Sequence, residues 1–96
     1  MKITRQDDFG GAVLNCAIRY CLGRQSYMPG LVMDEILMML PDCNDKTIRV
    51  FIQDVEEWLD RDSRMNETWL KDVYRKDWER FIIACRKELC DRGVQE

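Results

Sequence analysis

Acidic side chains on one expected helix come nearest to a chemical site in this sequence. Asp54, Glu57 and Asp60 recur at intervals of three residues, which places them along one side of a helix. Carboxylates spaced in this way could hold a divalent cation or carry out acid–base chemistry. The solvated face of an ordinary helix gives the same pattern, so the spacing favours a charged surface over a catalytic site.

Histidine, on which many hydrolytic and metal-dependent sites depend, is missing from the chain. Catalysis by a Ser–His or Cys–His pair and metal binding through imidazole are therefore excluded. Of the five cysteines, Cys16 and Cys21 are five residues apart, and so are Cys85 and Cys90. Five residues rotate a helix by about 500°, so the sulfurs of each pair point about 140° apart, which favours buried core cysteines over a zinc site. The sequence predicts a protein that is not an enzyme and that has no cofactor and no metal.

Acidity is concentrated in the middle third of the chain. Residues 31–62 hold nine acids and three bases, a net charge of −6, whereas the whole chain has a net charge of −3. This distribution argues against a protein that coats nucleic acid, which usually presents a basic face. A row of carboxylates could instead imitate a nucleic-acid backbone and occupy a basic channel of another protein. The residues expected to form this acidic face are Asp54, Glu56, Glu57, Asp60 and Asp62.

Basic residues gather nearer the C-terminus and support a different function. Within 71–87 they are Lys71, Arg75, Lys76, Arg80, Arg86 and Lys87, and acidic residues are interleaved with them. Alternating charges of this kind predict surface ion pairs, which are individually weak. Contact with nucleic acid through 71–87 is the alternative.

Helices must position these residues, because apolar side chains recur at helical spacing along most of the chain. Over 46–60 they fall at positions i, i+3, i+4 and i+7, which predicts an amphipathic helix with the acidic face on its outer side. The stretch 29–40 predicts a Met-rich helix that begins with a proline and is closed by Pro41. A further helical segment covers 67–92 and ends at Gly93, and the pattern leaves open whether it is one helix or two.

The stretch 9–23 is expected to be the helix around which the others pack. It is apolar on nearly every side, and between Ala12 and Leu22 it carries one charge, Arg19. A helix that is apolar all round is usually buried, and this one is too short for a bilayer, which requires about 20 apolar residues. Asp7 or Asp8 is a candidate N-cap. The sequence therefore predicts one all-α domain over 1–96, a compact bundle of four to five short helices around a buried N-terminal helix.

The segment that leads into the Met-rich helix carries a distinctive motif. Residues 15–28 read Asn-Cys-Ala-Ile-Arg-Tyr-Cys-Leu-Gly-Arg-Gln-Ser-Tyr-Met. This segment resembles the AxRYxLGRxxYM stretch of small, mostly uncharacterised proteins encoded by phages and prophages of Gram-positive bacteria. Residues 77–81, Asp-Trp-Glu-Arg-Phe, are similar to the C-terminal ends of those proteins. The resemblance covers about half of the chain and brings no catalytic residues with it.

What the resemblance implies is a small accessory protein made by a phage in a bacterial cytoplasm. Small acidic proteins of that setting often inhibit host defence, and anti-CRISPR proteins are the best-known group, although this step depends on setting and not on a motif. The odd number of cysteines independently favours a reduced, cytosolic protein, and no signal-peptide run is visible near Met1. Arg24 and Tyr27 of the motif are second-choice partner-binding residues, because Arg and Tyr are favoured at interfaces.

The leading hypothesis is a non-enzymatic phage protein that binds and inhibits a host macromolecule. Its most concrete form is an anti-CRISPR inhibitor that occludes the nucleic-acid channel of a Cas nuclease with the acidic face. The expected partner is a CRISPR nuclease or another nucleic-acid-binding host protein; no membrane contact is expected, and a homodimer through the Met-rich helix stays open. The alternative is a phage regulatory or replication accessory protein that contacts nucleic acid through 71–87.

Overall fold

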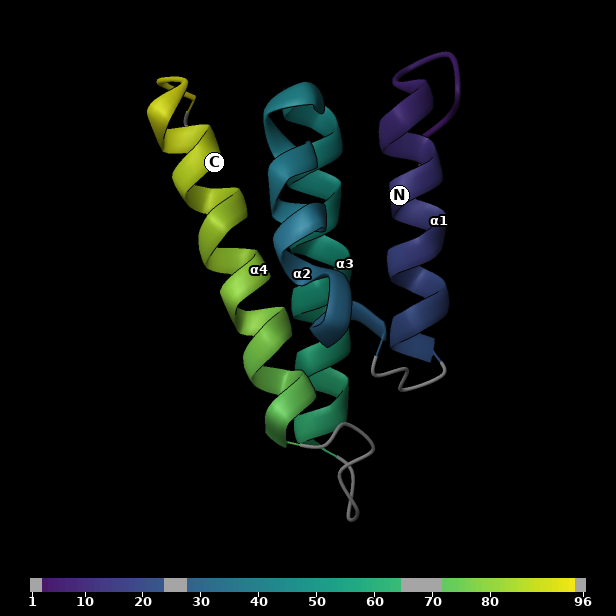
Figure 1. Cartoon of the computed structure of the whole chain (residues 1–96), viewed down its shortest axis with the longest axis vertical. Coiled ribbons are helices and arrows are strands. Elements are labelled where there is room, and N and C mark those ends of the chain that lie inside the picture. Colours follow the sequence, from purple (N-terminus) through teal and green to yellow (C-terminus); the bar gives the residue numbers. More distant parts are fainter. Residues whose placement is uncertain (1–2, 24–27, 65–71, 95–96) are drawn as a thin grey trace.

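Four α-helices make up most of the described chain. The computed structural model describes residues 3–23, 28–64 and 72–94. The elements are α1 (Phe9–Gly23), α2 (Met28–Met39), a short 3-10 helix η1 (Leu40–Asp42), α3 (Asp45–Ser63) and α4 (Asp72–Asp91), as Figure 1 shows. No strand occurs in these three ranges, so the predicted all-α bundle is confirmed. In the same ranges, no helix has the length and apolarity needed to cross a membrane.

α3 occupies the centre of the bundle. Its inner stripe includes Ile48, Phe51 and Val55, which are completely buried. α3 packs against both α1 and α4, whereas α2 packs mainly against α4. In the view of Figure 1, α2 and α3 overlap, and α1 and α4 lie on opposite sides of them. Phe51 lies 5.8 Å from Phe81 of α4 between ring centroids. Burying such a side chain contributes about 1.5–3 kcal/mol to stability, so the apolar stripe of α3 organises the fold.

α1 is not the buried centre that its composition predicts. Its inner side is buried, and consists of Gly11, Leu14, Asn15, Ile18 and Leu22. The opposite side carries Phe9, Val13 and Tyr20, which are 69%, 59% and 61% exposed. The prediction of a buried N-terminal helix was wrong because α3 takes the central place, and the neighbours of α1 in the described chain cover one side of it only.

Asp8 joins the start of α1 to the start of α3. One carboxylate oxygen accepts a hydrogen bond from the backbone N–H of Gly11 at 3.0 Å, so Asp8 caps α1 as the sequence predicted. The other oxygen accepts from the backbone N–H of Asn44 at 3.1 Å and from the hydroxyl of Thr47 at 2.9 Å. A Cβ on Gly11 would lie 2.5 Å from the Asp8 carboxylate and 2.6 Å from Cγ2 of Thr47, so this junction requires glycine.

None of the five cysteines, which all lie in the described ranges, forms a disulfide, and they divide between the core and the surface. Cys43 and Cys85 are buried as expected, but Cys16 and Cys90 are exposed, so the expectation of buried cysteines was wrong for the latter two. Burial raises the pKa of the Cys43 thiol to about 11, which keeps it neutral near pH 7. No group of three potential metal ligands occurs among the residues described.

The last helix ends where the sequence predicted. α4 is continuous from Asp72 to Asp91, and Gly93 follows it with a φ of 75°, a backbone conformation that favours glycine at the end of a helix. Residues 65–71 lie outside the described chain, so the question of one helix or two is answered only from Asp72 onward.

Candidate functional site

Asp62 does not belong to the acidic face in which the sequence placed it. Its side chain is completely buried, and its carboxylate accepts a hydrogen bond from the Arg75 guanidinium at 3.3 Å. The same guanidinium donates to the backbone oxygen of Leu59 and to the hydroxyl of Ser63. Asp62 continues the inner stripe of α3 three residues beyond Leu59, and this spacing was the signal that could have revealed its burial. Its prediction as a surface residue that binds a partner is therefore corrected: Asp62 ties the end of α3 to the start of α4.

Two further carboxylates of the acidic face are already paired with cations of the same chain. Glu56 lies 2.7 Å from the guanidinium of Arg86 on α4, and Asp60 lies 3.0 Å from that of Arg64. Each of these pairs is partly exposed, and each cation cancels much of the local negative charge. The outer side of α3 is thus a surface of alternating charge instead of a row of unmatched carboxylates.

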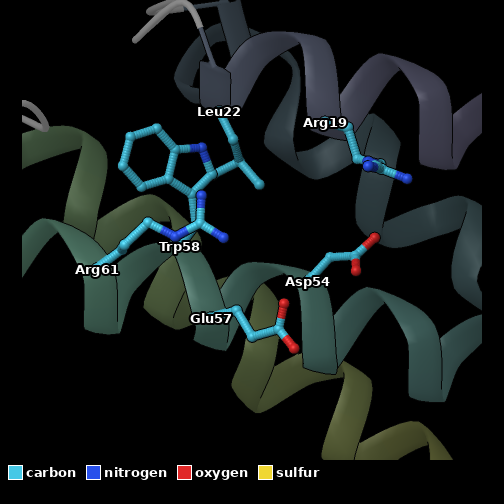
Figure 2. A pocket seen from close by; sticks show the side chains of 6 residues that line it. All are labelled: Arg19, Leu22, Asp54, Glu57, Trp58 and Arg61. Atoms are coloured by element: carbon cyan, nitrogen blue, oxygen red, sulfur yellow. The ribbon is translucent and has the colours of Figure 1, made fainter. Parts of the chain in front are cut away.

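The remaining two carboxylates line a hollow between α1 and α3. The hollow has a volume of about 200 Å³, and its lining residues are Arg19, Leu22, Asp54, Glu57, Trp58 and Arg61. Figure 2 shows the side chains of Arg19 and Leu22 reaching in from α1 and the other four coming from α3. The side-chain amide of Asn15 donates a hydrogen bond to the carboxylate of Asp54 at 3.2 Å, and this bond joins α1 to α3 beside the hollow. We refer to this feature as the α1–α3 hollow.

The two arginines of the α1–α3 hollow are not held in ion pairs within the described chain, whereas Arg75, Arg80 and Arg86 on α4 are. Within the described chain, no ion pair or hydrogen bond is formed by the guanidinium of Arg19 or of Arg61. Glu57, which lines the same hollow, accepts one hydrogen bond from the uncharged Gln53 at 3.4 Å. The hollow therefore combines two cations whose donors are available with carboxylates that also keep bonding capacity.

This arrangement can form charge-assisted hydrogen bonds of both signs. A guanidinium presents its donors in a planar fork that suits the carboxylates of a partner protein, while Asp54 and Glu57 can accept from a partner's cations. Trp58, half-buried at the wall, adds a flat apolar surface. Arg and Trp are the residue types that most often dominate protein interfaces, so the α1–α3 hollow suits a protein partner of mixed charge.

The basic residues within 71–87 are largely matched by acidic residues. The described pairs are Arg75 with Asp62, Arg80 with Asp34, Arg86 with Glu56 and Lys87 with Asp91. Lys71 lies outside the described residues. Ion pairing of this extent reduces the positive field that attracts nucleic acid. The geometry therefore supports nucleic-acid binding through 71–87 less than it supports partner binding through the α1–α3 hollow.

Sequence reasoning and the structure agree on part of this site. Asp54 and Glu57 were predicted to bind a partner, and they do lie together in the hollow. Trp58 has the spacing of the apolar stripe over 46–60, and Arg61 was not singled out. Nothing in the positions of these two residues shows that α1 brings Arg19 opposite them. Arg24 and Tyr27, the second-choice residues, lie outside the described residues.

Comparison with known proteins gives no relative for this small helical bundle. No protein-family model, no curated protein and no solved structure matches the chain. The candidate site is therefore defined by its geometry alone.

Proposed function

We propose that this protein is not an enzyme and that it acts in the bacterial cytoplasm by binding another protein through the α1–α3 hollow. The observation that carries the proposal is the pair of available guanidiniums, Arg19 and Arg61, beside the half-buried indole of Trp58. An arginine that is buried against a partner carboxylate commonly contributes 2 kcal/mol or more to an interface. Arginines already held in ion pairs would have to give up those pairs first.

The partner class that we propose is a host defence nuclease, and the protein would inhibit it in a cell infected by phage. The resemblance of residues 15–28 to phage-encoded proteins supports this step, and the hollow does not. A nuclease of the CRISPR type binds its guide heteroduplex in a positively charged channel. Glu57 is the carboxylate best suited to enter such a channel, because its hydrogen-bond donor, Gln53, is uncharged. The guanidiniums of Arg19 and Arg61 would pair with acidic residues beside the channel, because the channel itself would repel them.

The proposal is tested by measuring binding of the purified full-length chain to a CRISPR nuclease loaded with its guide, at low and high salt. We expect Arg61→Glu and Trp58→Ala each to weaken binding at least about tenfold, which corresponds to about 1.4 kcal/mol. Lys76→Glu is the matched control, because Lys76 is an exposed cation on α4, away from the hollow. Its affinity should equal that of the wild type.

Two results would contradict the proposal. Equal affinity for the Arg61→Glu and Lys76→Glu variants would show that the α1–α3 hollow is not the contact surface. Retention of DNA or RNA by the isolated chain, with no protein retained, would favour the regulatory or replication alternative. In that case the loss of nucleic-acid binding should follow substitution of Lys76 instead of Arg61.

A further inference from the structure

The side of α1 that faces away from the bundle is apolar along its whole length. Its exposed residues include Phe9, Val13, Cys16, Ala17 and Tyr20, which follow one another at helical spacing and which we call the outer face of α1. The large side chains among them are more than half exposed. Exposed apolar residues that form a continuous stripe, instead of being scattered singly, mark a surface that is covered in the functional state.

This outer face continues into an apolar groove between α1 and α2. The groove has a volume of about 150 Å³, and Ala17 lies at its edge, with Val32 and Ile36 of α2 opposite and Trp78 of α4 at its base. The apolar surface therefore extends from α1 onto α2, away from the α1–α3 hollow.

Charge does not oppose the meeting of two such surfaces. Over 9–23 the chain has one charged residue, Arg19, and that residue lies in the α1–α3 hollow beside Asp54. Like charges facing each other across an interface are what usually keeps identical surfaces apart. Although the whole chain has a net charge of −3, two copies of the outer face can approach without repulsion.

Gly10 leaves room for another molecule on this surface. It lies inside α1, where glycine costs about 1 kcal/mol relative to alanine, and a Cβ placed on it would meet nothing within 4 Å. No contact inside the described chain requires a glycine there. A glycine at an open helical position is explained if a side chain of another molecule fills the space above it.

We propose that a second copy of this chain covers the outer face, with the two α1 helices packed antiparallel about a twofold axis. Along the face, small and large residues alternate in the order Gly10, Val13, Ala17 and Tyr20. With the axis between Val13 and Ala17, Tyr20 of each copy lies over Gly10 of the other, and Val13 lies over Ala17. Each large side chain then meets a small one, which allows two helices to approach to about 8–10 Å.

The available area is sufficient for a weak dimer. The exposed parts of Phe9 and Tyr20 amount to roughly 100–150 Å² each, since whole aromatic side chains bury 150–250 Å². With Val13 and the smaller residues, each copy contributes about 400 Å², or about 800 Å² for the pair, which corresponds to a weak interface. The dimer goes beyond the proposed function and leaves the α1–α3 hollow of each copy open.

The dimer is tested by measuring the mass of the full-length chain in solution by sedimentation velocity over a range of concentrations up to about 100 µM, because mass action then reveals a weak dimer. We expect the wild type to reach the dimer mass and Val13→Glu to weaken association at least about tenfold. Ile83→Glu is the control, because Ile83 is 68% exposed on α4 and should leave the dimer intact. Circular dichroism of each variant establishes that it is folded.

Cysteine cross-linking tests the antiparallel arrangement separately. Cys16 is one residue from the proposed axis, so a short bismaleimide should join two copies through it, whereas Cys90, exposed on α4, should not contribute. Cys16→Ser should abolish the cross-linked dimer and Cys90→Ser should preserve it. A wild type that remains monomeric at the highest concentration, or a Val13→Glu variant that dimerises like the wild type, would overturn the proposal. Cross-linking that depends on Cys90 would also overturn it.

Discussion

The outer sides of α1 and α3 differ as much as any two surfaces of this molecule. α3 follows the usual division, with a buried apolar stripe on one side and charged residues, several of them in ion pairs, on the other. α1 also has a buried stripe, but its other side remains apolar and exposed. The inner sides of both helices are explained by the fold of one chain. The outer side of α3 is explained by contact with water, and for that of α1 we have proposed a second copy of the chain.

The largest loss of stability is expected at Asp62, a charged residue that lies on the buried side of α3. Asp62→Ala should lower the free energy of unfolding by about 3 kcal/mol, because the Arg75 guanidinium would lose its buried charged acceptor. Asp60→Ala, which removes an exposed pair with Arg64, should cost less than about 1 kcal/mol. Urea denaturation measures both. Equal losses would show that burial of Asp62 contributes nothing to its importance.

The two adjacent glycines of α1 sharpen the contrast between its inner and outer sides. Gly11→Ala should destabilise the fold by about 1–3 kcal/mol, since the added Cβ would overlap Asp8 and Thr47. Gly10→Ala should stabilise the monomer by about 0.5–1 kcal/mol, because its Cβ meets nothing in the chain. Thermal unfolding at concentrations that keep the chain monomeric measures the two changes. Destabilisation by both substitutions would place Gly10 in an intramolecular contact.

Acid should weaken the junction that Asp8 forms between the start of α1 and the start of α3. Partial burial raises the pKa of Asp8, but hydrogen bonds from Gly11, Asn44 and Thr47 outweigh it and hold that pKa below its ordinary value. A carboxylate whose pKa is depressed on folding stabilises the protein fully above its unfolded pKa of about 3.9, and this contribution is lost as the pH falls through the folded-state pKa.

The corresponding variant is Asp8→Asn. It should lower the free energy of unfolding by about 1 kcal/mol at pH 7, as loss of a helix cap does, and the difference from the wild type should shrink as the pH falls below about 3.9. Chemical denaturation over this range of pH measures the effect. A difference that is independent of pH would mean that folding does not lower the pKa of the Asp8 carboxyl group.

The smallest effect is expected from the exposed ion pairs on the charged side of α3. A double-mutant cycle with Glu56→Gln and Arg86→Gln should give a coupling energy of about 0.2–1 kcal/mol, reduced further by salt. A coupling energy above about 2 kcal/mol would show that this pair is shielded from solvent in a way that its exposure does not indicate.

Local patterns in the sequence predicted most of the fold. The apolar spacing over 46–60 identified α3, which extends from Asp45 to Ser63, and Gly93 correctly marked the end of α4. The position of α1 could not be predicted in this way, because apolar spacing shows which residues avoid water and does not show what covers them. Asp62 was misplaced for a related reason: its burial depends on Arg75, which only the packing of α4 on α3 brings near.

The α1–α3 hollow could be predicted only in part. Asp54 and Glu57 share one side of a helix, and their spacing reveals this. Arg19 joins them from a helix 35 residues earlier in sequence than Asp54, and such a meeting depends on tertiary packing alone. The charge balance of the outer side of α3 was missed for the same reason, because Arg86, the partner of Glu56, comes from α4.

The positions of two tryptophans give each candidate surface its own optical reporter. Trp58 lines the α1–α3 hollow, and Trp78 lies at the base of the groove between α1 and α2. The side chain of Trp58 is partly exposed and that of Trp78 is almost wholly buried, so their fluorescence should differ in emission maximum and in access to a soluble quencher. The third tryptophan, Trp69, lies outside the described residues and would be replaced by Phe in every sample. In a chain that also carries Trp58→Phe, the remaining tryptophan emission comes from Trp78. Addition of a partner protein should then change the fluorescence of Trp58, whereas dilution of the dimer should change the fluorescence of Trp78.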